Sequence, residues 1–184
     1  MRTNPTEPNM GTKNTDDWLR FGMGDNWFAL PLSAVRETVT SPHMTPVPRM
    51  PAHLCGVSNL RGRIISMVDL RRFSFPPETA PETMTSPSPA IISRLKPVDS
   101  TAAELNIGFL VDHVYEVIRF PVDQILPAPL FGIPVIMDFV HGIFDPGLTE
   151  PRGGITILLD PDRILSALLS EVRPLSSGEK GGGG

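Results

Sequence analysis

The feature that most restricts the fold of this chain is an internal repeat. Shifting the sequence by 79 residues aligns 29–39 with 108–118, and shifting it by 91 residues aligns 61–73 with 152–164. Seven of the 24 aligned positions are identical, and the two blocks occur in the same order in each half. Self-similarity of this kind is typical of a duplicated structural unit. We therefore expect two similar subdomains.

Within the repeat, the apolar segments are short and rich in Val, Ile and Phe, which predicts strands rather than helices. The predicted strands are 18–21, 27–30, 64–68, 91–95, 107–111, 114–120 and 155–159. Glycines and a DN pair between the first two predict a hairpin over 18–30. The 21 prolines argue against a helical bundle. Because small sheets protect their edges by closing, each half is expected to be an antiparallel unit forming a compact β-barrel.

One helix is predicted, at the end of the second half. Asp160 is suited to cap it, Pro161 fits the first helical position, and an apolar stripe at helical spacing is formed by Ile164, Leu165, Leu168 and Leu169.

Three segments have compositions that disfavour a packed fold. Residues 1–17 contain almost no large apolar groups and are expected to be a disordered lead-in. Residues 74–90 contain five prolines and six Ser or Thr, which predicts a linker. Residues 174–184 end in four glycines and are expected to be a flexible tail. The expected folded domain is 18–173, with one subdomain at about 18–73 and the second, with the helix, at about 91–173.

Composition and motifs exclude several functional classes. The net charge of -4 argues against nucleic-acid binding. The sequence has no phosphate-binding loop, no nucleophile elbow, and four histidines without ligand spacing, so we expect no catalytic residues, metal or cofactor. A single cysteine and the lack of a long apolar run favour a cytoplasmic protein without direct membrane insertion.

Two residues, Cys55 and Arg61, are candidates for a functional role. Cys55, with His53 nearby, is the only candidate nucleophile for a small Cys-dependent hydrolase, but its apolar neighbours favour a buried structural thiol. Arg61, next to Gly62, is expected at a turn where its guanidinium faces outward and suits a charged or backbone partner. The alternative for Arg61 is an ordinary solvated turn residue.

The chain resembles the CheW-like family, the coupling proteins of bacterial chemotaxis arrays. The resemblance spans about residues 18–170 and rests on FGMGDNWFALPLSAVRETV, GVSNLRG with ISMVDLR, NIGFLVDHVYEVI, QILPAPL and GGITILLDPDRIL. It implies a mainly β fold of two similar five-stranded, SH3-like β-barrel subdomains with a C-terminal helix. It also implies a non-catalytic scaffold that links the cytoplasmic tips of methyl-accepting chemoreceptors to the regulatory domain of a CheA-like histidine kinase, with possible ring-like array assembly.

The resemblance also implies two sets of site residues. It places receptor binding near the cleft between the barrels, on Val35, Glu37, Gly56, Asn59 and Arg61. It places kinase binding on Pro127, Pro129, Leu130 and Phe131, although Leu130 and Phe131 suit core packing equally well.

The sequence departs from the family pattern at three places. Met67 stands where proline is usual, and the 74–90 linker and the 144–154 loop are long and rich in proline. These differences leave open a coupler specialised for one receptor, or one with a weakened kinase contact. A peptide-binding barrel module outside chemotaxis is the alternative from another class.

Overall fold

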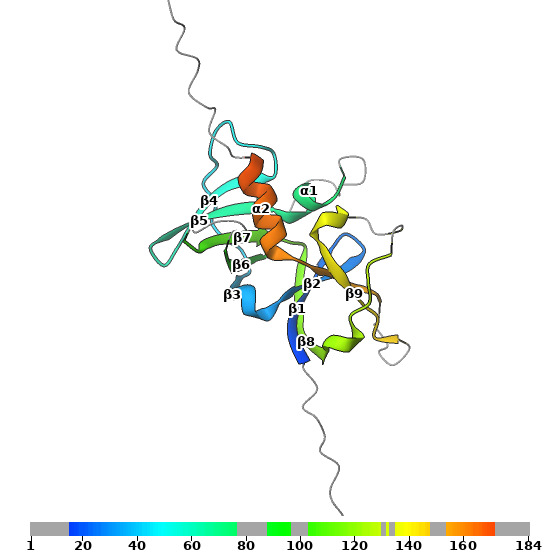
Figure 1. Cartoon of the computed structure of the whole chain (residues 1–184). Helices are drawn as coiled ribbons and strands as arrows, with labels where there is room; N and C mark the ends of the chain where they lie inside the picture. Colours follow the sequence, from blue (N-terminus) through cyan, green and yellow to red (C-terminus); the bar gives the residue numbers. More distant parts are fainter. Residues whose placement is uncertain are drawn as a thin grey trace, which may run out of the picture.

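The computed structural model describes residues 15–76, 88–96, 103–129, 132, 135–147 and 154–171, and these residues form two five-stranded sheets (Figure 1). The strands are β1 (Thr15–Met23), β2 (Asn26–Pro31), β3 (Val35–Val39), β4 (Leu54–Leu60), β5 (Arg63–Asp69), β6 (Ala90–Leu95), β7 (Leu105–Leu110), β8 (His113–Pro121), β9 (Val140–Phe144) and β10 (Thr156–Leu159). The helices are α1 (Leu70–Ser74) and α2 (Pro161–Glu171), with 3-10 turns η1 (Leu32–Ala34), η2 (Val122–Gln124) and η3 (Met137–Phe139).

The mainly β prediction, the hairpin over 18–30 and the C-terminal helix are confirmed. All seven predicted strands are present, with small shifts at their ends. Strands β3, β4 and β9 and the short helix α1 were not predicted. These strands were missed because β3 and β4 contain many polar residues and β9 is short, so their apolar runs are weak.

The two sheets combine strands from both halves of the sequence. Sheet A has the order β8-β1-β2-β10-β9, and sheet B has the order β3-β6-β7-β5-β4. Parallel pairing of β2 with β10 and of β5 with β7 joins the halves. The expectation of one antiparallel unit per half was therefore wrong. The first copy of the repeat contains β1–β5 and the second contains β6–β10. Sheet A combines β1 and β2 of the first copy with β8, β9 and β10 of the second, and sheet B combines β6 and β7 of the second copy with β3, β4 and β5 of the first.

The closed barrels expected from the sequence are not confirmed. Among the described residues, β8 does not pair with β9, and β3 does not pair with β4. Single bridges instead protect part of two edges: Thr45 pairs with Val57 of β4, and Leu126 pairs with Ile143 of β9. Thr45 and Leu126 each lie in the loop that precedes the strand they pair with. These loops therefore cover part of the strand edges that a closed barrel would pair.

Apolar residues form three clusters, one between the sheets and one on the other face of each sheet. The largest contains Phe21 and Phe28 from sheet A together with Val68 and Phe109 from sheet B, so it joins the sheets. The cluster beyond sheet B centres on Met67 and Ile92. The cluster beyond sheet A contains Trp18, Ala29, Phe120 and Leu158. Alternation along β1 explains this arrangement, because Leu19, Phe21 and Met23 face the central cluster while Trp18 faces away.

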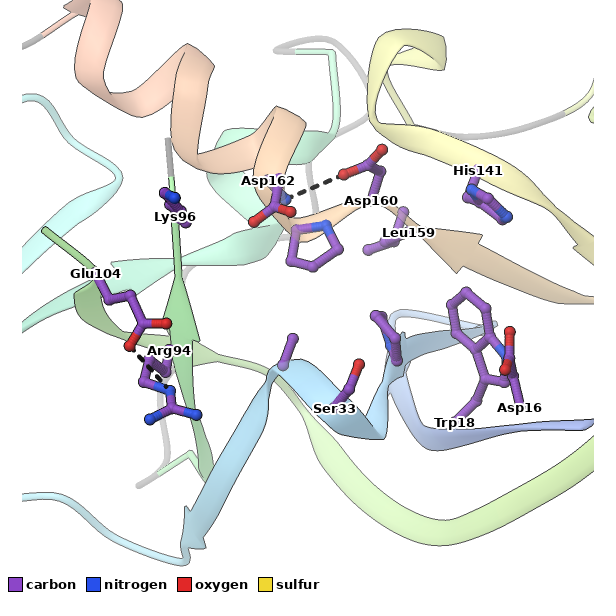
Figure 2. Close-up of a pocket in the computed structure, with 13 residues that line it drawn as sticks. Asp16, Trp18, Ser33, Arg94, Lys96, Glu104, His141, Leu159, Asp160 and Asp162 are labelled. Atoms are coloured by element: carbon purple, nitrogen blue, oxygen red, sulfur yellow. Dashed lines mark hydrogen bonds and ion pairs between the residues drawn. The ribbon is translucent and has the colours of Figure 1, made fainter. Parts of the chain in front are cut away.

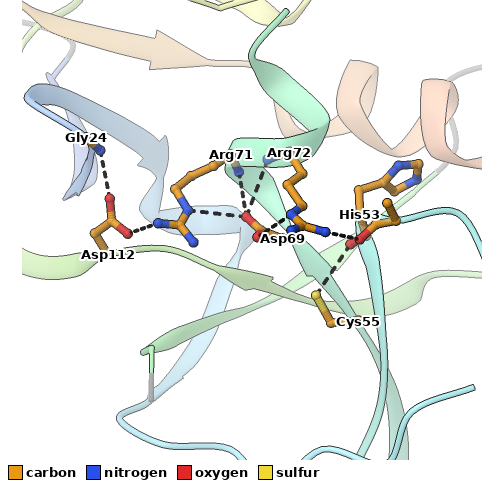
Figure 3. A network of polar contacts seen from close by, with 8 residues as sticks. Gly24, His53, Cys55, Asp69, Arg71, Arg72 and Asp112 are labelled. Atoms are coloured by element: carbon orange, nitrogen blue, oxygen red, sulfur yellow. Dashed lines mark hydrogen bonds and ion pairs between the residues drawn. The ribbon is translucent and has the colours of Figure 1, made fainter. Parts of the chain in front are cut away.

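A buried polar network also joins the two sheets (Figure 3). Arg71 in α1 lies 3.4 Å from Asp69 Oδ1 and donates to Asp112 Oδ1 at 2.5 Å. Asp112 Oδ2 accepts from the backbone N–H of Gly24, in the β1–β2 turn, at 2.7 Å. The Arg71 and Asp69 side chains are almost fully buried. The network therefore connects the end of β5 to the hairpin of the other sheet.

The repeat is visible at the two strand-to-helix junctions. Asp69 accepts from the backbone N–H groups of Arg71 and Arg72, and Asp160 accepts from those of Asp162 and Arg163. The arginine three residues later pairs with each aspartate, at 3.7 Å for Arg72 and 3.2 Å for Arg163. The matched aspartates of the sequence repeat thus cap the two helices, and the matched arginines pair with them in the same way.

Several expected segments lie partly outside the described residues. Strand β1 begins at Thr15, so the last three residues of the expected 1–17 lead-in belong to the sheet. The outer residues of the 74–90 linker belong to α1 and β6, and 77–87 lies outside the described residues, as does the 174–184 tail.

Candidate functional site

The tight turn between β4 and β5 positions the first group of candidate residues. Leu60 pairs with Arg63, so Arg61 and Gly62 form a two-residue hairpin loop. Their φ values are 52° and 80°, as a type I′ turn requires. Asn59 stabilises the turn, because its Oδ1 accepts from the Gly62 N–H at 3.0 Å. Arg61 is therefore held at the tip of the hairpin.

The turn brings Arg61 to Glu37 of β3. Arg61 Nη2 lies 3.1 Å from Glu37 Oε2, and the Arg61 side chain is 85% exposed. A salt bridge this exposed contributes little to folding. Its main effect is to orient the Arg61 guanidinium, which still has free donors for a partner.

Glu37 and Arg61 lie in a hollow of about 470 Å³ that we call the arginine cleft. It is lined by Arg36, Glu37, Leu60, Arg61, Arg63, Ile65, Ile92 and Asn106. Arg36 Nη1 donates to Asn106 Oδ1 at 3.1 Å. Sequence reasoning found Glu37 and Arg61 but missed Arg36, Arg63 and Asn106, because their proximity depends on pairing between distant strands.

Gly56 is buried and lies in a second, apolar hollow of about 210 Å³. Its φ is +134°, and a Cβ there would lie 2.3 Å from the Thr45 carbonyl oxygen. The position therefore requires glycine to allow the 45–57 bridge. Val47, Met50 and Leu169 line the same hollow, which lies beside the C-terminal end of α2.

The five residues predicted to bind a receptor do not form a single surface. Val35 is half-buried and packs against the central cluster. Glu37 and Arg61 share the arginine cleft, with Asn59 supporting its turn, while Gly56 lies under the apolar hollow. Strand pairing thus brings together three of the five.

A third hollow, of about 410 Å³, lies between the two sheets at the start of α2 (Figure 2). Its charged groups come from both sheets and from α2. Arg94 and Glu104 pair at 3.4 Å, and burial raises the pKa of Asp162. None of the five predicted receptor residues is among the described residues that line it. The expectation that these residues bind a receptor near the cleft between the subdomains stays a prediction.

The predicted kinase-binding residues are only partly described. Pro127 and Pro129 are exposed in the segment that follows η2, close to the bridge formed by Leu126. Leu130 and Phe131 lie outside the described residues, so both interpretations of them remain predictions.

The environment of Cys55 is that of a structural thiol. Its Sγ lies 3.8 Å from the His53 carbonyl oxygen, so the contact is to the backbone and not to the imidazole. Burial raises the pKa of the Cys55 thiol, which disfavours the nucleophilic thiolate. The His53 ring instead packs against Phe73 with its plane tilted by 57°, and His53 Nε2 lies 3.2 Å from Oε2 of Glu171 in α2.

The described residues contain no group of three or more His, Cys, Asp or Glu side chains placed to hold a metal ion. None of their helices has the length and apolar character needed to cross a membrane.

Comparison with known proteins gives consistent matches. The CheW-like domain family matches residues 17–169. The Chemotaxis protein CheW of Klebsiella aerogenes is 25% identical over 151 residues, which is 82% of each chain. Protein PilI of Pseudomonas aeruginosa is 30% identical over 129 residues, 68% of this chain and 65% of PilI. The crystal structure of scaffolding protein TtCheW from Thermoanaerobacter tengcongensis has a TM-score of 0.64 and 25% identity, covering 80% of this chain and 90% of that one.

Proposed function

This chain belongs to the CheW-like family, and on that premise we propose that it links chemoreceptors to a CheA-type histidine kinase. Proteins of this family are non-catalytic coupling proteins of chemotaxis and related signalling, and the chain is one of them. The specific partners are the cytoplasmic tip of a methyl-accepting chemoreceptor and the regulatory domain of the kinase. In this role the chain works in the cytoplasm, next to the membrane that carries the receptors.

The observation that carries the receptor part of the proposal is the Glu37–Arg61 pair. Residues from β3 and from the β4–β5 turn meet at an exposed position, and Asn59 fixes the turn. The pair adds little to the stability of the fold. Its geometry is better explained by binding, because the pair presents the Arg61 guanidinium to a partner. A planar, fixed guanidinium is suited to bidentate recognition of a carboxylate or of backbone carbonyls.

The proposed mechanism needs no chemical step. A scaffold changes kinase activity only if its contacts differ between signalling states, because a partner with equal affinity for both states shifts neither. The two sheets provide separate surfaces, so one molecule can hold a receptor at sheet B and a kinase elsewhere. Repeated contacts of this kind can close into rings.

The receptor contact is tested by binding to a purified receptor tip fragment. We expect Arg61→Ala to weaken binding at least about tenfold, through loss of charge-assisted hydrogen bonds, while leaving the unfolding midpoint nearly unchanged. Arg119→Ala is the matched control, because Arg119 also forms an exposed cross-strand pair, with Asp17. Unchanged binding by Arg61→Ala, or an equal loss in the control, would show that Arg61 does not contact the receptor.

The kinase contact is tested by calorimetry with the isolated regulatory domain of the cognate kinase. Phe131→Ser is expected to reduce binding if the 127–131 segment is the kinase surface, since apolar anchors carry much of the energy of such interfaces. Binding by the parent chain with no loss in the variant would place the kinase surface elsewhere.

A further inference from the structure

The arginine cleft has a local charge opposite to that of the chain. Three arginines line it, Arg36 from β3 and Arg61 and Arg63 from the β4–β5 hairpin, against one carboxylate, Glu37. The whole chain has a net charge of -4. Converging guanidinium groups repel one another, so a cluster of this kind is favourable when an anionic group binds between them.

Two of the three guanidinium groups are already oriented. Arg36 donates to Asn106 at 3.1 Å, and Arg61 pairs with Glu37 at 3.1 Å from a backbone fixed by the type I′ turn. Each guanidinium has five N–H donors, so these contacts leave most of the donors available. Within the part of the chain that the structure describes, no carboxylate pairs with Arg63. The cleft therefore offers preorganised donors and, among the described residues, two arginines without an acid partner, Arg36 and Arg63.

The rest of the cleft favours a peptide over a small free anion. Half-buried Leu60 provides apolar surface beside the arginines, and it packs against the cluster that contains buried Ile65 and Ile92. A volume of about 470 Å³ exceeds what one phosphate or carboxylate group fills. An acidic side chain with an apolar neighbour would use both kinds of surface.

We infer that the arginine cleft binds an acidic segment of a protein partner, with carboxylates held by Arg36, Arg61 and Arg63 and an apolar side chain against Leu60. The identity of that partner as the receptor rests on the proposed function, since Glu37 and Arg61 belong to both. The acidic character of the segment does not depend on the proposed function, because this character is inferred from the residues that line the cleft.

The test uses the full chain and two labelled peptides of about 12 residues, which span this cleft in extended form. One contains glutamates around a central leucine, and the other has lysine at each glutamate position. We expect fluorescence anisotropy to detect binding of the glutamate peptide only, weakening as salt is raised. Arg63→Gln should weaken it about tenfold, and Arg63→Lys should weaken it less, because lysine keeps the charge but loses the bidentate geometry.

Lys96→Gln is the matched control, since it also removes one positive charge but lies at the hollow between the sheets. Equal binding of the two peptides, or an equal loss in Lys96→Gln, would overturn the inference. Inorganic phosphate is a further competitor. If it displaced the glutamate peptide at a concentration no higher than the peptide concentration required for binding, the inference would also be overturned, because the cleft would then be a site for a free anion.

The inference and the proposed function fail in different ways. Receptor binding that depends on Arg61, without binding of the glutamate peptide, would leave the proposed function standing and overturn the inference. Glutamate-peptide binding that depends on Arg63, without any receptor binding, would support the inference and overturn the proposed function.

Discussion

Two glycines in the same β-hairpin show how differently individual residues are constrained. Gly56 is buried with its Cβ direction blocked by the Thr45 carbonyl, whereas a Cβ on Gly62 would meet nothing within 4 Å. Both have positive φ. The first glycine is needed for space and conformation, and the second for conformation alone.

We predict that Gly56→Ala is much more destabilising than Gly62→Ala. The first change should cost roughly 2–3 kcal/mol, because it adds a clash with backbone to a strained φ, and the second about 1 kcal/mol from the left-handed conformation alone. Urea unfolding of both variants measures the difference. Equal destabilisation would contradict this prediction, because it would mean that the backbone around Thr45 moves to make room for a Cβ at position 56.

His53 gives the protein a residue-scale pH dependence. Its pKa is lowered from the usual value near 6.5, mainly by burial, although the Glu171 and Asp69 carboxylates act in the opposite direction. The unfolded chain therefore binds the proton more readily, so the His53 contribution to stability is complete above about pH 6.5 and is lost as the pH falls below it. Protonation of His53 works against the folded state.

We expect the unfolding midpoint of the parent chain to fall between pH 7.5 and pH 5 more steeply than that of His53→Gln. Thermal unfolding across this range measures both slopes. His113→Gln, at an exposed position on β8, is the control and should keep the slope of the parent. Identical slopes for the parent and His53→Gln would show that burial of His53 does not affect stability.

At the residue scale, sequence reasoning placed Arg61 at a turn and Asp160 at the helix cap, and the structure has both there. Both predictions depend on local chemistry, a turn glycine next to an arginine and an acid before a proline. The ion pair of Arg61 with Glu37 was not predicted. Sequence reasoning missed Arg36 and Arg63, because nothing local distinguishes them from solvated arginines. Only the pairing of β3, β6, β7 and β5 places them in one cleft with Asn106.

At the scale of elements, α1 shows how a short helix is held by polar contacts. It has only five residues, which is too short to be stable alone. Asp69 caps it, and Arg71 connects it to Asp112 and so to the β1–β2 turn. The helix therefore acts as a connector between the sheets.

We predict that Arg71→Ala destabilises the protein by about 3 kcal/mol, because it leaves the buried Asp69 and the nearby Asp112 without their shared cation. Chemical denaturation measures the loss, with Arg72→Ala as the comparison, since Arg72 is more exposed and lies farther from Asp69. A smaller loss in Arg71→Ala than in Arg72→Ala would contradict the assignment of Arg71 as the connector.

Two of the predicted strands are buried along most of their length. In β6 only Arg94 is exposed, and Thr156–Leu159 of β10 is buried throughout, so their apolar pattern is clear. Strand β3 alternates between half-buried and exposed positions, and β4 contains Gly56, Ser58 and Asn59. Their pairing partners, rather than their composition, make them strands.

At the scale of the whole molecule, the described strands form two five-stranded sheets that do not coincide with the two halves of the sequence. Each sheet takes strands from both halves, and the central cluster joins the sheets. The sequence shows which segments are duplicated, but not which copy each segment pairs with. The parallel pairs β2–β10 and β5–β7 show that β2 and β5 of the first half each pair with a strand of the second half.

We therefore predict that neither half folds alone. A fragment ending at 76 lacks β10 and β7, so β2 and β5 each lose a neighbour, and the central cluster loses 13 of its 22 buried residues. Mixing it with a fragment starting at 88 should restore the fold, which circular dichroism and amide NMR spectra would detect. Well-dispersed spectra from the first fragment alone would contradict the exchange of strands.

The central claim is that this chain joins a receptor to a kinase, and the most direct measurement is sedimentation of the cognate kinase with receptor-bearing membranes. We predict that the kinase sediments when the chain is added and stays in the supernatant without it, and that Arg61→Ala prevents sedimentation whereas Arg119→Ala does not. A kinase distribution that is the same with and without the chain would contradict the coupling function.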